Sequence, residues 1–394
     1  MRNALIVLLL LASGSGQTRA DELSSNVHLR GDFNNARLRF ERDGVGHVAF
    51  IGGSITEMNG YRPMVCQYLQ ERFPKTKFTF TDAGISSTCS TTGAFRLEED
   101  VLSKGPVDLF FVEFAVNDDQ DAMHAPRECR RGIEGILRHA LTHNPKMDIV
   151  VTYFVNEGML ALLQQGKQPV SIQAHETVAD HYGVTTSLHA QEVADQITAG
   201  KLTWKEYGGV HPAPRGNAIA AGLIRNLLEH CWSQPLNPKA QARDHQLPEM
   251  LDPSSYSNGR FLPHTVATLG EGWQEGIPDW KEIPGSFRSR FANVSCLYAD
   301  HPGAELKYSF EGTSTGAYVL AGPDAGQLEV SIDGGKFETV NLFHSYSKGL
   351  HYPRTVMLAT DLKPGKHDVV LRVSSGHVDG SKGTAARIMH LTAN

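Results

Sequence analysis

The stretch FIGGSIT, residues 50–56, places Ser54 directly after two glycines and at the end of a short apolar run. An apolar run that ends in glycines indicates a buried strand followed by a sharp turn. Ser54 is then either a helix cap, the ordinary role of a serine at such a turn, or a nucleophile held clear of its own backbone. The residues on either side of this stretch decide between the two roles.

Between about residues 46 and 232, strand-like apolar runs alternate with longer helix-like patterns. The predicted strands are His47–Ile51, Phe78–Asp82, Val107–Glu113, Asp148–Phe154 and Val184–Leu188. The predicted helices are Tyr61–Phe73, Arg127–Thr142 and Ala213–Cys231. Such alternation is typical of an α/β domain with a parallel sheet covered on both faces, in which sites form at the carboxyl ends of the strands. Ser54 follows one such end.

The character of the sequence changes after Trp232. Residues 233–263 hold five prolines among polar residues, which indicates a linker or a segment that wraps the first domain. Residues 264–394 carry short strand-like runs separated by turns, and this spacing predicts a jelly-roll-like β-sandwich. The predicted strands are Leu306–Phe310, Ala317–Ala321, Gln327–Ile332, Thr355–Leu358, His367–Val373 and Arg387–Leu391.

The first twenty residues differ from the rest of the chain. Arg2, the apolar residues 4–12 and a small, polar stretch up to Ala20 indicate a secretory signal peptide, followed by an N-terminal arm over residues 21–45. The apolar run is too short to span a bilayer stably, although an uncleaved anchor is the alternative. We therefore expect a secreted or periplasmic protein with no stable membrane span.

The overall composition narrows the range of partners. The 394 residues are 40% hydrophobic and 20% charged with a net charge of −6, which supports a real core and argues against nucleic acid as a partner. The five cysteines are odd in number and widely spaced, so we expect mostly buried thiols with one unassigned disulfide at most. His139 and His143 are four residues apart without a third ligand. No metal and no cofactor is predicted.

Four separated motifs lie at or near predicted strand ends, at residues 52–56, 82–87, 113–118 and 209–212. They contain, in order, Ser54, Gly84, Asn117 and His211. Any one of these motifs occurs by chance, but all four in this order on these elements form a specific pattern. The pattern resembles the SGNH (GDSL-like) hydrolase family over residues 46–232, about half of the chain.

The resemblance implies a flavodoxin-like three-layer domain and a serine esterase. It implies Ser54 as the nucleophile and His211 as the general base. The implied oxyanion hole is made of the Ser54 N–H, the Gly84 N–H and the side-chain amide of Asn117. These roles are chemically consistent, because a serine hydroxyl needs a base to take its proton and a tetrahedral oxyanion needs preorganised donors.

Gly208 marks one departure from the family pattern, which has an aspartate three residues before the histidine to orient the imidazole. Three interpretations are open. A backbone carbonyl near Gly208 orients His211 in a Ser–His dyad, another acid such as Glu206 takes the place of the aspartate, or the site is degenerate and inactive. The presence of nucleophile, base and oxyanion donors favours an active site.

Three further residues are candidates for the substrate cleft. Arg62 and Arg96 follow the first two motifs and could bind an acidic or hydroxylated substrate, the alternative being arginines on a helix surface. Trp204 lies four residues before Gly208 and could wall the cleft or pack in the core.

The sequence as a whole predicts an exported esterase that hydrolyses short acyl esters, above all acetyl groups on a polysaccharide, through an acyl-enzyme on Ser54. A lipase-like or lysophospholipase-like esterase is one alternative. A second alternative is a catalytically degenerate carbohydrate-binding protein, in which Tyr318, Phe337 and Tyr346 hold a glycan rather than form the sandwich core.

Overall fold

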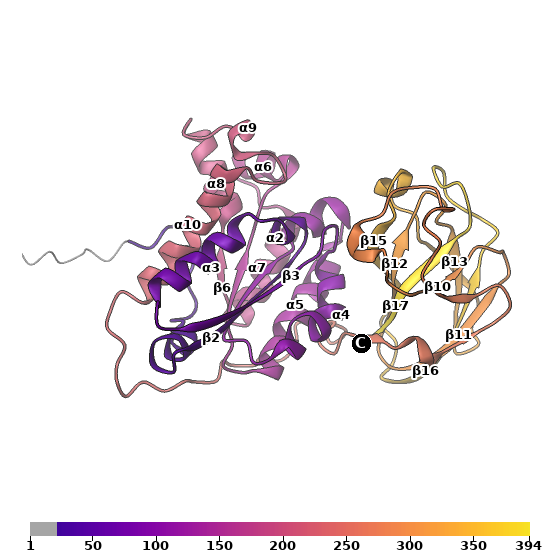
Figure 1. Cartoon of the computed structure of the whole chain (residues 1–394), viewed down its shortest axis with the longest axis horizontal. Helices are drawn as coiled ribbons and strands as arrows, with labels where there is room; N and C mark the ends of the chain where they lie inside the picture. Colours follow the sequence, from indigo (N-terminus) through magenta and orange to yellow (C-terminus); the bar gives the residue numbers. More distant parts are fainter. Residues whose placement is uncertain (1–21) are drawn as a thin grey trace, which may run out of the picture.

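The computed structural model describes residues 22–394 and contains two domains side by side (Figure 1). The predicted signal peptide lies outside the described residues. Among residues 22–394, no helix is both long and apolar enough to cross a bilayer.

The first domain is built on a six-stranded sheet in the order β1-β6-β5-β4-β2-β3. Five strands run parallel, and β1 pairs with β6 in the antiparallel direction. The strand bounds are β1 Val27–His28, β2 Val45–Gly52, β3 Lys77–Gly84, β4 Leu109–Glu113, β5 Asp148–Thr152 and β6 Thr185–Ser187. All five predicted strands are present. The predicted N-terminal arm is part of the sheet, because β1 lies within it.

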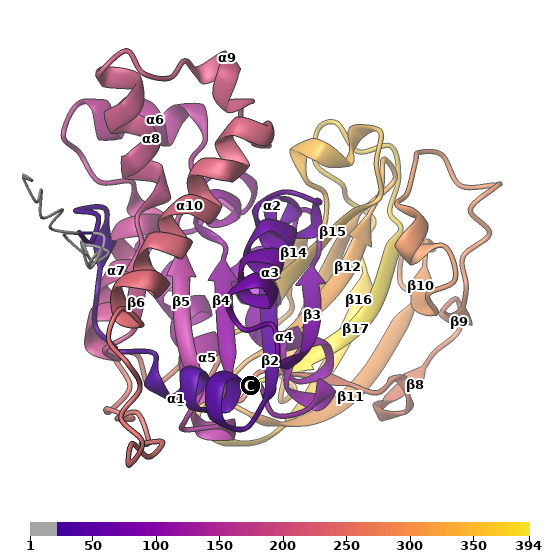
Figure 2. The same cartoon turned by 60° about the vertical axis from the view of Figure 1, so that its left-hand side comes forward.

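Helices cover both faces of this sheet (Figures 1 and 2). α3 packs against α10 on one side, and α4, α5 and α7 pack together on the other. The helix bounds are α1 Asn34–Arg37, α2 Ser54–Glu57, α3 Tyr61–Arg72, α4 Ser90–Asp100, α5 Pro126–His143, α6 Glu157–Gln164, α7 Val170–His181, α8 His189–Thr198, α9 Trp204–Tyr207 and α10 Pro214–Cys231. The parallel strand order 3-2-4-5-6 is that of the flavodoxin-like three-layer fold.

The second domain is a β-sandwich of two antiparallel sheets, ordered β15-β12-β17-β10-β9, with β7 beside β17, and β14-β13-β16-β11-β8. Among β10 to β17, the sheet orders 10-17-12-15 and 11-16-13-14 form a jelly roll. The bounds are β7 Arg260–Leu262, β8 Ala267–Leu269, β9 Gln274–Gly276, β10 Cys296–Ala299, β11 Glu305–Gly312, β12 Thr315–Ala321, β13 Gln327–Ile332, β14 Glu338–Asn341, β15 Tyr352–Ala359, β16 Gly365–Val373 and β17 Ala386–Ala393. The sandwich therefore begins at Arg260, inside the predicted linker.

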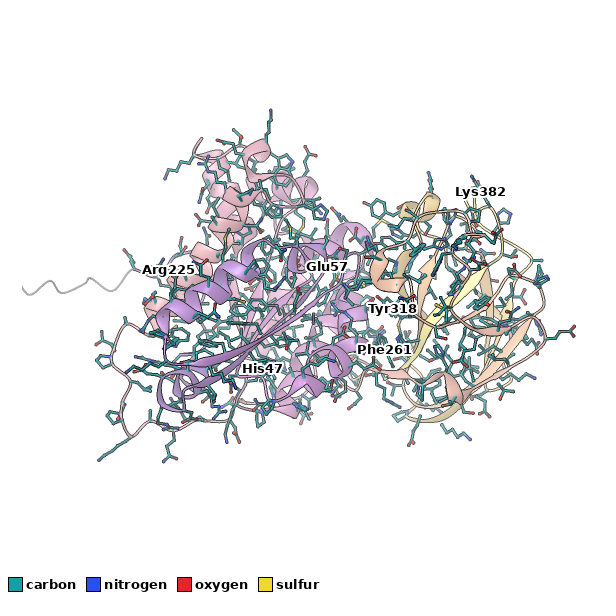
Figure 3. All side chains as sticks on the ribbon, viewed as in Figure 1. His47, Glu57, Arg225, Phe261, Tyr318 and Lys382 are labelled. Atoms are coloured by element: carbon teal, nitrogen blue, oxygen red, sulfur yellow. The ribbon has the colours of Figure 1, made fainter. Side chains whose placement is uncertain are left out.

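The domains share an apolar interface. Tyr318 stacks on Phe261 with ring centroids 5.7 Å apart, and both side chains lie at the domain boundary (Figure 3). Ile85 from the first domain joins a small core cluster with Phe291, Tyr318 and Leu320 from the second. Tyr318 is therefore a buried interface residue and cannot present its ring to a glycan. The five cysteines are all free thiols, so the structure contains no disulfide among residues 22–394.

Candidate active site

Ser54 and His211 meet at the carboxyl edge of the parallel sheet. Ser54 is the first residue of α2, directly after β2, and His211 lies in the loop between α9 and α10. The Nε2 atom of His211 is 2.8 Å from the Oγ atom of Ser54. Ser54 is half-buried and His211 is exposed. A serine hydroxyl and a base are therefore in hydrogen-bond contact at a position open to solvent.

The two glycines before Ser54 are required by close packing. A Cβ atom at Gly52 would lie 2.2 Å from Oγ1 of Thr56, and one at Gly53 would lie 2.0 Å from Oδ1 of Asn117. The Asn117 amide thus packs directly on the backbone beside Ser54. The glycines let the strand turn and also let the Asn117 side chain approach the nucleophile.

Asn117 begins a single π-helical turn, η3 (Asn117–Asp121), after β4. Its Nδ2 atom donates a hydrogen bond to Oδ2 of Asp121, which is buried. Burial raises the pKa of Asp121, while the hydrogen bond from Asn117 and the charges of His211 and Arg288 act against that rise. Asp121 therefore holds the Asn117 amide and is a carboxyl group within electrostatic reach of His211. Sequence reasoning missed Asp121, because a π turn leaves no spacing signal.

The structure does not support Gly84 as an oxyanion donor. The Gly84 N–H donates to Oδ1 of Asp82 at 3.0 Å. The next two amides of this loop are also bonded, that of Ile85 to the Gly52 carbonyl and that of Ser86 to Oε2 of Glu57. Ser87 is different. Its backbone has a φ of 71°, which costs a non-glycine residue about 1 kcal/mol or more. Its N–H meets no acceptor within residues 22–394. Ser87 is the residue of this loop whose amide is free to bind an oxyanion.

Gly208, at the position of the missing aspartate, has no room for a side chain. It ends α9 with a φ of 105°, and a Cβ atom there would lie 2.1 Å from the backbone nitrogen of Ala213. The N–H of Ala213 closes this turn by donating to the Tyr207 carbonyl at 2.7 Å. The loop therefore carries His211 without an acid at Gly208.

Glu206, the other acid considered, is used elsewhere. Its carboxylate accepts from the backbone and hydroxyl of Thr203 in a capping box and pairs with Arg215 at 2.8 Å. The structure therefore contradicts Glu206 as the orienting acid. Within residues 22–394 the Nδ1 atom of His211 makes no hydrogen bond. Ser54 and His211 thus form a hydrogen-bonded pair without an acid bound to the imidazole within residues 22–394.

The two candidate cleft arginines are engaged within the protein. Arg96 is 1% exposed and donates to the carbonyl oxygens of Gly52 and Ala83, so the prediction that it lines the cleft is wrong. Arg62 is mostly buried and pairs with Asp82 at 2.6 Å. Arg96 thus braces the ends of β2 and β3, and Arg62 ties the end of β3 to Thr56 of α2. Trp204 is half-buried and stacks on Tyr207 at 5.2 Å, and its role in a cleft stays a prediction.

Asp118, next to Asn117, anchors the strand-end loop. Its carboxylate accepts hydrogen bonds from the backbone and hydroxyl of Ser90 and from Nε2 of His175. Burial works to raise the pKa of Asp118, but the hydrogen bonds from His124 and His175 outweigh it and lower the pKa. Asp118 also lies with Cys89 and His124 in the one group among residues 22–394 that offers three metal ligand atoms within 4.8 Å. Because both Asp118 oxygens already accept hydrogen bonds, this group fits a structural anchor better than a metal site.

The second domain reaches the edge of the site. The Nε2–H of His344 donates a hydrogen bond to the carbonyl oxygen of Asp121 (2.7 Å), and the His344 ring stacks on Tyr352 at 4.5 Å. Tyr346 packs beside this pair with half of its surface exposed. A cavity of about 230 Å³ lies between the two domains here. It is lined by Ser87 and Asp121 from the first domain and by Tyr352 from the second. Phe337, by contrast, lies under Arg372 with 3.9 Å between the guanidinium carbon and the ring centre.

Residues 50–219 match the model of the GDSL-like Lipase/Acylhydrolase family. Among solved structures, the chain is similar to a two-domain esterase (CEX) active on acetylated mannans, co-crystallised with mannopentaose. That match has a TM-score of 0.72 and 19% identity, and covers 93% of this chain and 95% of the other. A second structure of an esterase described in the same terms matches with a TM-score of 0.70 and 20% identity, over 89% and 91% of the two chains. No curated protein matches the chain. At this identity the structural matches show the two-domain fold.

Proposed function

Residues 50–219 of this chain form a GDSL-like lipase/acylhydrolase domain, and on this premise we propose that the protein is an exported serine esterase. Its proposed substrates are short acyl esters, above all acetyl groups on carbohydrate. The observation that carries the proposal is the 2.8 Å contact between Ser54 Oγ and His211 Nε2, beside an asparagine amide held in place by Asp121.

In the proposed reaction, Ser54 Oγ attacks the acyl carbonyl while His211 Nε2 accepts the hydroxyl proton. The carbonyl oxygen becomes an oxyanion bound by the Ser54 N–H, the Ser87 N–H and the second hydrogen of the Asn117 amide. The bond to the sugar oxygen then breaks, and that oxygen takes the proton from His211. Water, deprotonated by His211, attacks the acyl-enzyme, and release of the acid returns the proton to Ser54.

Asp121 substitutes in this scheme for the acid that Gly208 cannot supply. A positively charged imidazole forms in each step, and a nearby carboxylate stabilises it. The charge of His211 acts on Asp121, and the same carboxylate holds Asn117. One acid therefore serves both the base and the oxyanion hole.

A carbohydrate ester is favoured as substrate by three observations. The half-exposed ring of Tyr346 lies beside His344, next to the site, and aromatic rings of this kind stack on sugars. The similar two-domain structure is that of an esterase active on acetylated mannans. The apolar residues 4–12 support export to where polysaccharides are found.

The test compares wild type with Ser54→Ala and His211→Ala on p-nitrophenyl acetate, butyrate and octanoate and on acetylated mannan and xylan. Ser103→Ala is the matched control, because Ser103 is an exposed serine whose hydroxyl only donates to the Glu99 carbonyl. We expect turnover of the acetate to fall by more than about 10³-fold in both site variants and to stay at wild-type level in the control.

Three results would contradict parts of the proposal. Turnover that survives Ser54→Ala would exclude the acyl-enzyme. A preference for octanoate would favour a lipase-like enzyme. Absence of turnover on every ester, with retained binding of mannan, would favour a carbohydrate-binding protein.

A further inference from the structure

The segment from Gly84, the last residue of β3, to Thr88, shortly before α4, is held by the second domain at three separate points. Arg288 and Arg290 flank the start of a 3₁₀ turn, η5 (Ser289–Phe291), which precedes β10. Tyr352 begins β15. These three side chains reach across the domain boundary to the loop that carries the free amide of Ser87.

The hydroxyl oxygen and the carbonyl oxygen of Ser87 both accept hydrogen bonds from the second domain. Arg288 Nη2 donates to its hydroxyl oxygen at 2.8 Å, and the Tyr352 hydroxyl donates to its carbonyl oxygen at 3.3 Å. These bonds fix the side chain and the following peptide of a residue in the left-handed region. A serine has no intrinsic preference for that region, so contacts from outside must hold it there.

The start of the loop is held in the same way. Arg290 Nη1 donates to the Gly84 carbonyl at 3.0 Å and pairs with Glu57. Glu57 lies three residues after Ser54, and its other carboxylate oxygen accepts from the backbone and hydroxyl of Ser86. Arg290 therefore joins the helix of the nucleophile to the loop of the proposed oxyanion donor.

Apolar packing closes the remaining side of the loop. Ile85 is 8% exposed and lies in one cluster with Phe291, Tyr318 and Leu320, all from the second domain. Glu57, Phe261 and Tyr318 can be followed in Figure 3 from the nucleophile helix to the domain boundary. Three consecutive residues, Ile85 to Ser87, are thus in contact either with the sandwich or with Glu57, which the sandwich binds through Arg290.

We propose that the second domain is a structural part of the oxyanion hole, with Arg288, Arg290 and Tyr352 as positioning residues that hold the Ser87 amide toward the reacting carbonyl. This inference rests on the proposed esterase function. It adds that stabilisation of the transition state depends on the second domain. None of the three residues takes a proton or needs to contact the acyl group.

The test uses the full chain with Arg288→Ala, Tyr352→Phe and the double variant. Tyr352→Phe removes only the hydroxyl and keeps the ring on His344. Matched controls are Arg372→Ala and Tyr298→Phe, because the side chains of both residues bond within the sandwich, Arg372 to Glu305 and Glu329 and Tyr298 to Gln274. Three quantities are measured in each variant: kcat and KM on p-nitrophenyl acetate, the Tm, and hydrogen exchange of the peptide that spans residues 82–90.

We expect kcat of the double variant to fall about 10-fold or more, short of the 10²–10³-fold loss typical of a deleted oxyanion donor. KM is expected to change by less than about twofold, because a donor aimed at the oxyanion stabilises the transition state rather than the ground state. Exchange of residues 82–90 is expected to accelerate while Tm stays near wild type. Arg288→Lys is expected to recover part of the loss.

Faster exchange with unchanged kcat would overturn the positioning role, since the loop would then be held without effect on catalysis. Equal losses in the two control variants, or a loss that follows a fall in Tm, would overturn it as well. A wild-type protein without Ser54-dependent turnover would instead refute the proposed function and, with it, the catalytic meaning of the contacts. Exchange of the loop would then report only on domain packing, so the two failures are distinguishable.

Discussion

Glu113 is a fully buried carboxyl group directly beneath the turn that carries Ser54. Its Oε2 atom accepts from the Thr56 hydroxyl at 3.1 Å, and the Gly53 N–H also donates to this carboxyl group. Burial raises the pKa of Glu113 to about 7, and these two hydrogen bonds only reduce the rise. The protein therefore places a buried acid, which retains its proton up to a pH of about 7, beneath the turn of the nucleophile.

This placement predicts a pH dependence of stability. The folded protein retains the Glu113 proton above the pKa of about 4.5 that it has when unfolded, so the free energy of unfolding falls as the pH rises from about 4.5 to 7. At about 1.4 kcal/mol per pKa unit, this group contributes a decrease of roughly 3 kcal/mol over that window. Glu113→Gln, which cannot ionise, is expected to lack this decrease in urea unfolding at pH 4.5, 6 and 7.5.

The matched control is Glu71→Gln, a substitution at an exposed glutamate of α3. It should follow the wild-type pH profile. Identical pH profiles of wild type and Glu113→Gln would show that Glu113 is ionised at no cost, contrary to its burial.

At the scale of elements, the α9–α10 connection explains why the histidine loop has no aspartate. α9 is one turn long and ends at Gly208, whose φ of 105° and tight contact with Ala213 exclude a side chain. Gly209 also has a positive φ, 80°, but a Cβ atom there would have no neighbour within 4 Å. The turn brings His211 to Ser54 by its backbone conformation alone.

We therefore expect that introduction of the family's aspartate would not restore a triad. Gly208→Asp is expected to lower the free energy of unfolding by about 1–3 kcal/mol more than Gly209→Asp, because both substitutions share the φ penalty and only the first adds a clash. It is also expected not to raise kcat. Thermal unfolding and p-nitrophenyl acetate turnover check both points, and a Gly208→Asp protein with wild-type Tm and higher kcat would refute this explanation.

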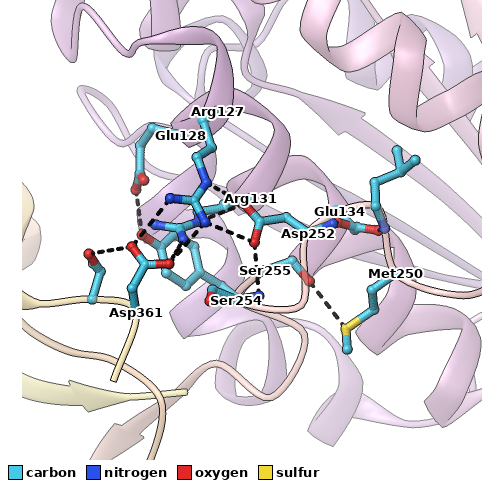
Figure 4. A network of polar contacts seen from close by, with 12 residues as sticks. Arg127, Glu128, Arg131, Glu134, Met250, Asp252, Ser254, Ser255 and Asp361 are labelled. Carbon is cyan, nitrogen blue, oxygen red and sulfur yellow. Dashed lines mark hydrogen bonds and ion pairs between the residues drawn. The ribbon is translucent and has the colours of Figure 1, made fainter. Parts of the chain in front are cut away.

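At the scale of the whole molecule, a network of charged groups joins the first domain, the connecting segment and the sandwich (Figure 4). Arg131 of α5 has a buried side chain and donates to Asp252 of the connecting segment at 3.0 Å and to Asp361 of the sandwich. Arg127, one turn earlier, binds the same two carboxylates from an exposed position. The hydrogen bond from Arg131 lowers the pKa of Asp361 to about 2. The connecting segment is thus part of the interface rather than a free linker.

The two arginines predict a matched pair of variants. Arg131→Ala leaves the buried Asp252 without its buried partner and is expected to cost about 3–5 kcal/mol of stability. Arg127→Ala removes an exposed cation from the same carboxylates and is expected to lower stability far less than Arg131→Ala, because solvent screens an exposed ion pair. Urea unfolding of both variants measures the difference. Equal effects would mean that the network stabilises the interface only as a surface ion pair.

Much of this protein could be predicted from the sequence because local patterns determine local structure. The five apolar runs are strands of the sheet, the carboxyl end of one of them carries Ser54, and the later short runs form the jelly roll. Asn117 and His211 were identified by their order along the chain, and the structure brings both next to Ser54.

The remaining features depend on contacts between residues far apart in the sequence. No pattern distinguishes Gly84 from Ser87 as the free amide, because that depends on which N–H is already bonded to Asp82 or Glu57. Arg96 is a helix arginine by sequence and is buried only because two strand ends place their carbonyls around it. The role of Asp121 depends on a π turn, and the contacts of Arg288 and Tyr352 depend on how two domains pack. The sequence by itself determined which elements form and which residues could react, whereas the tertiary structure decided which polar groups are already satisfied and which remain free to act.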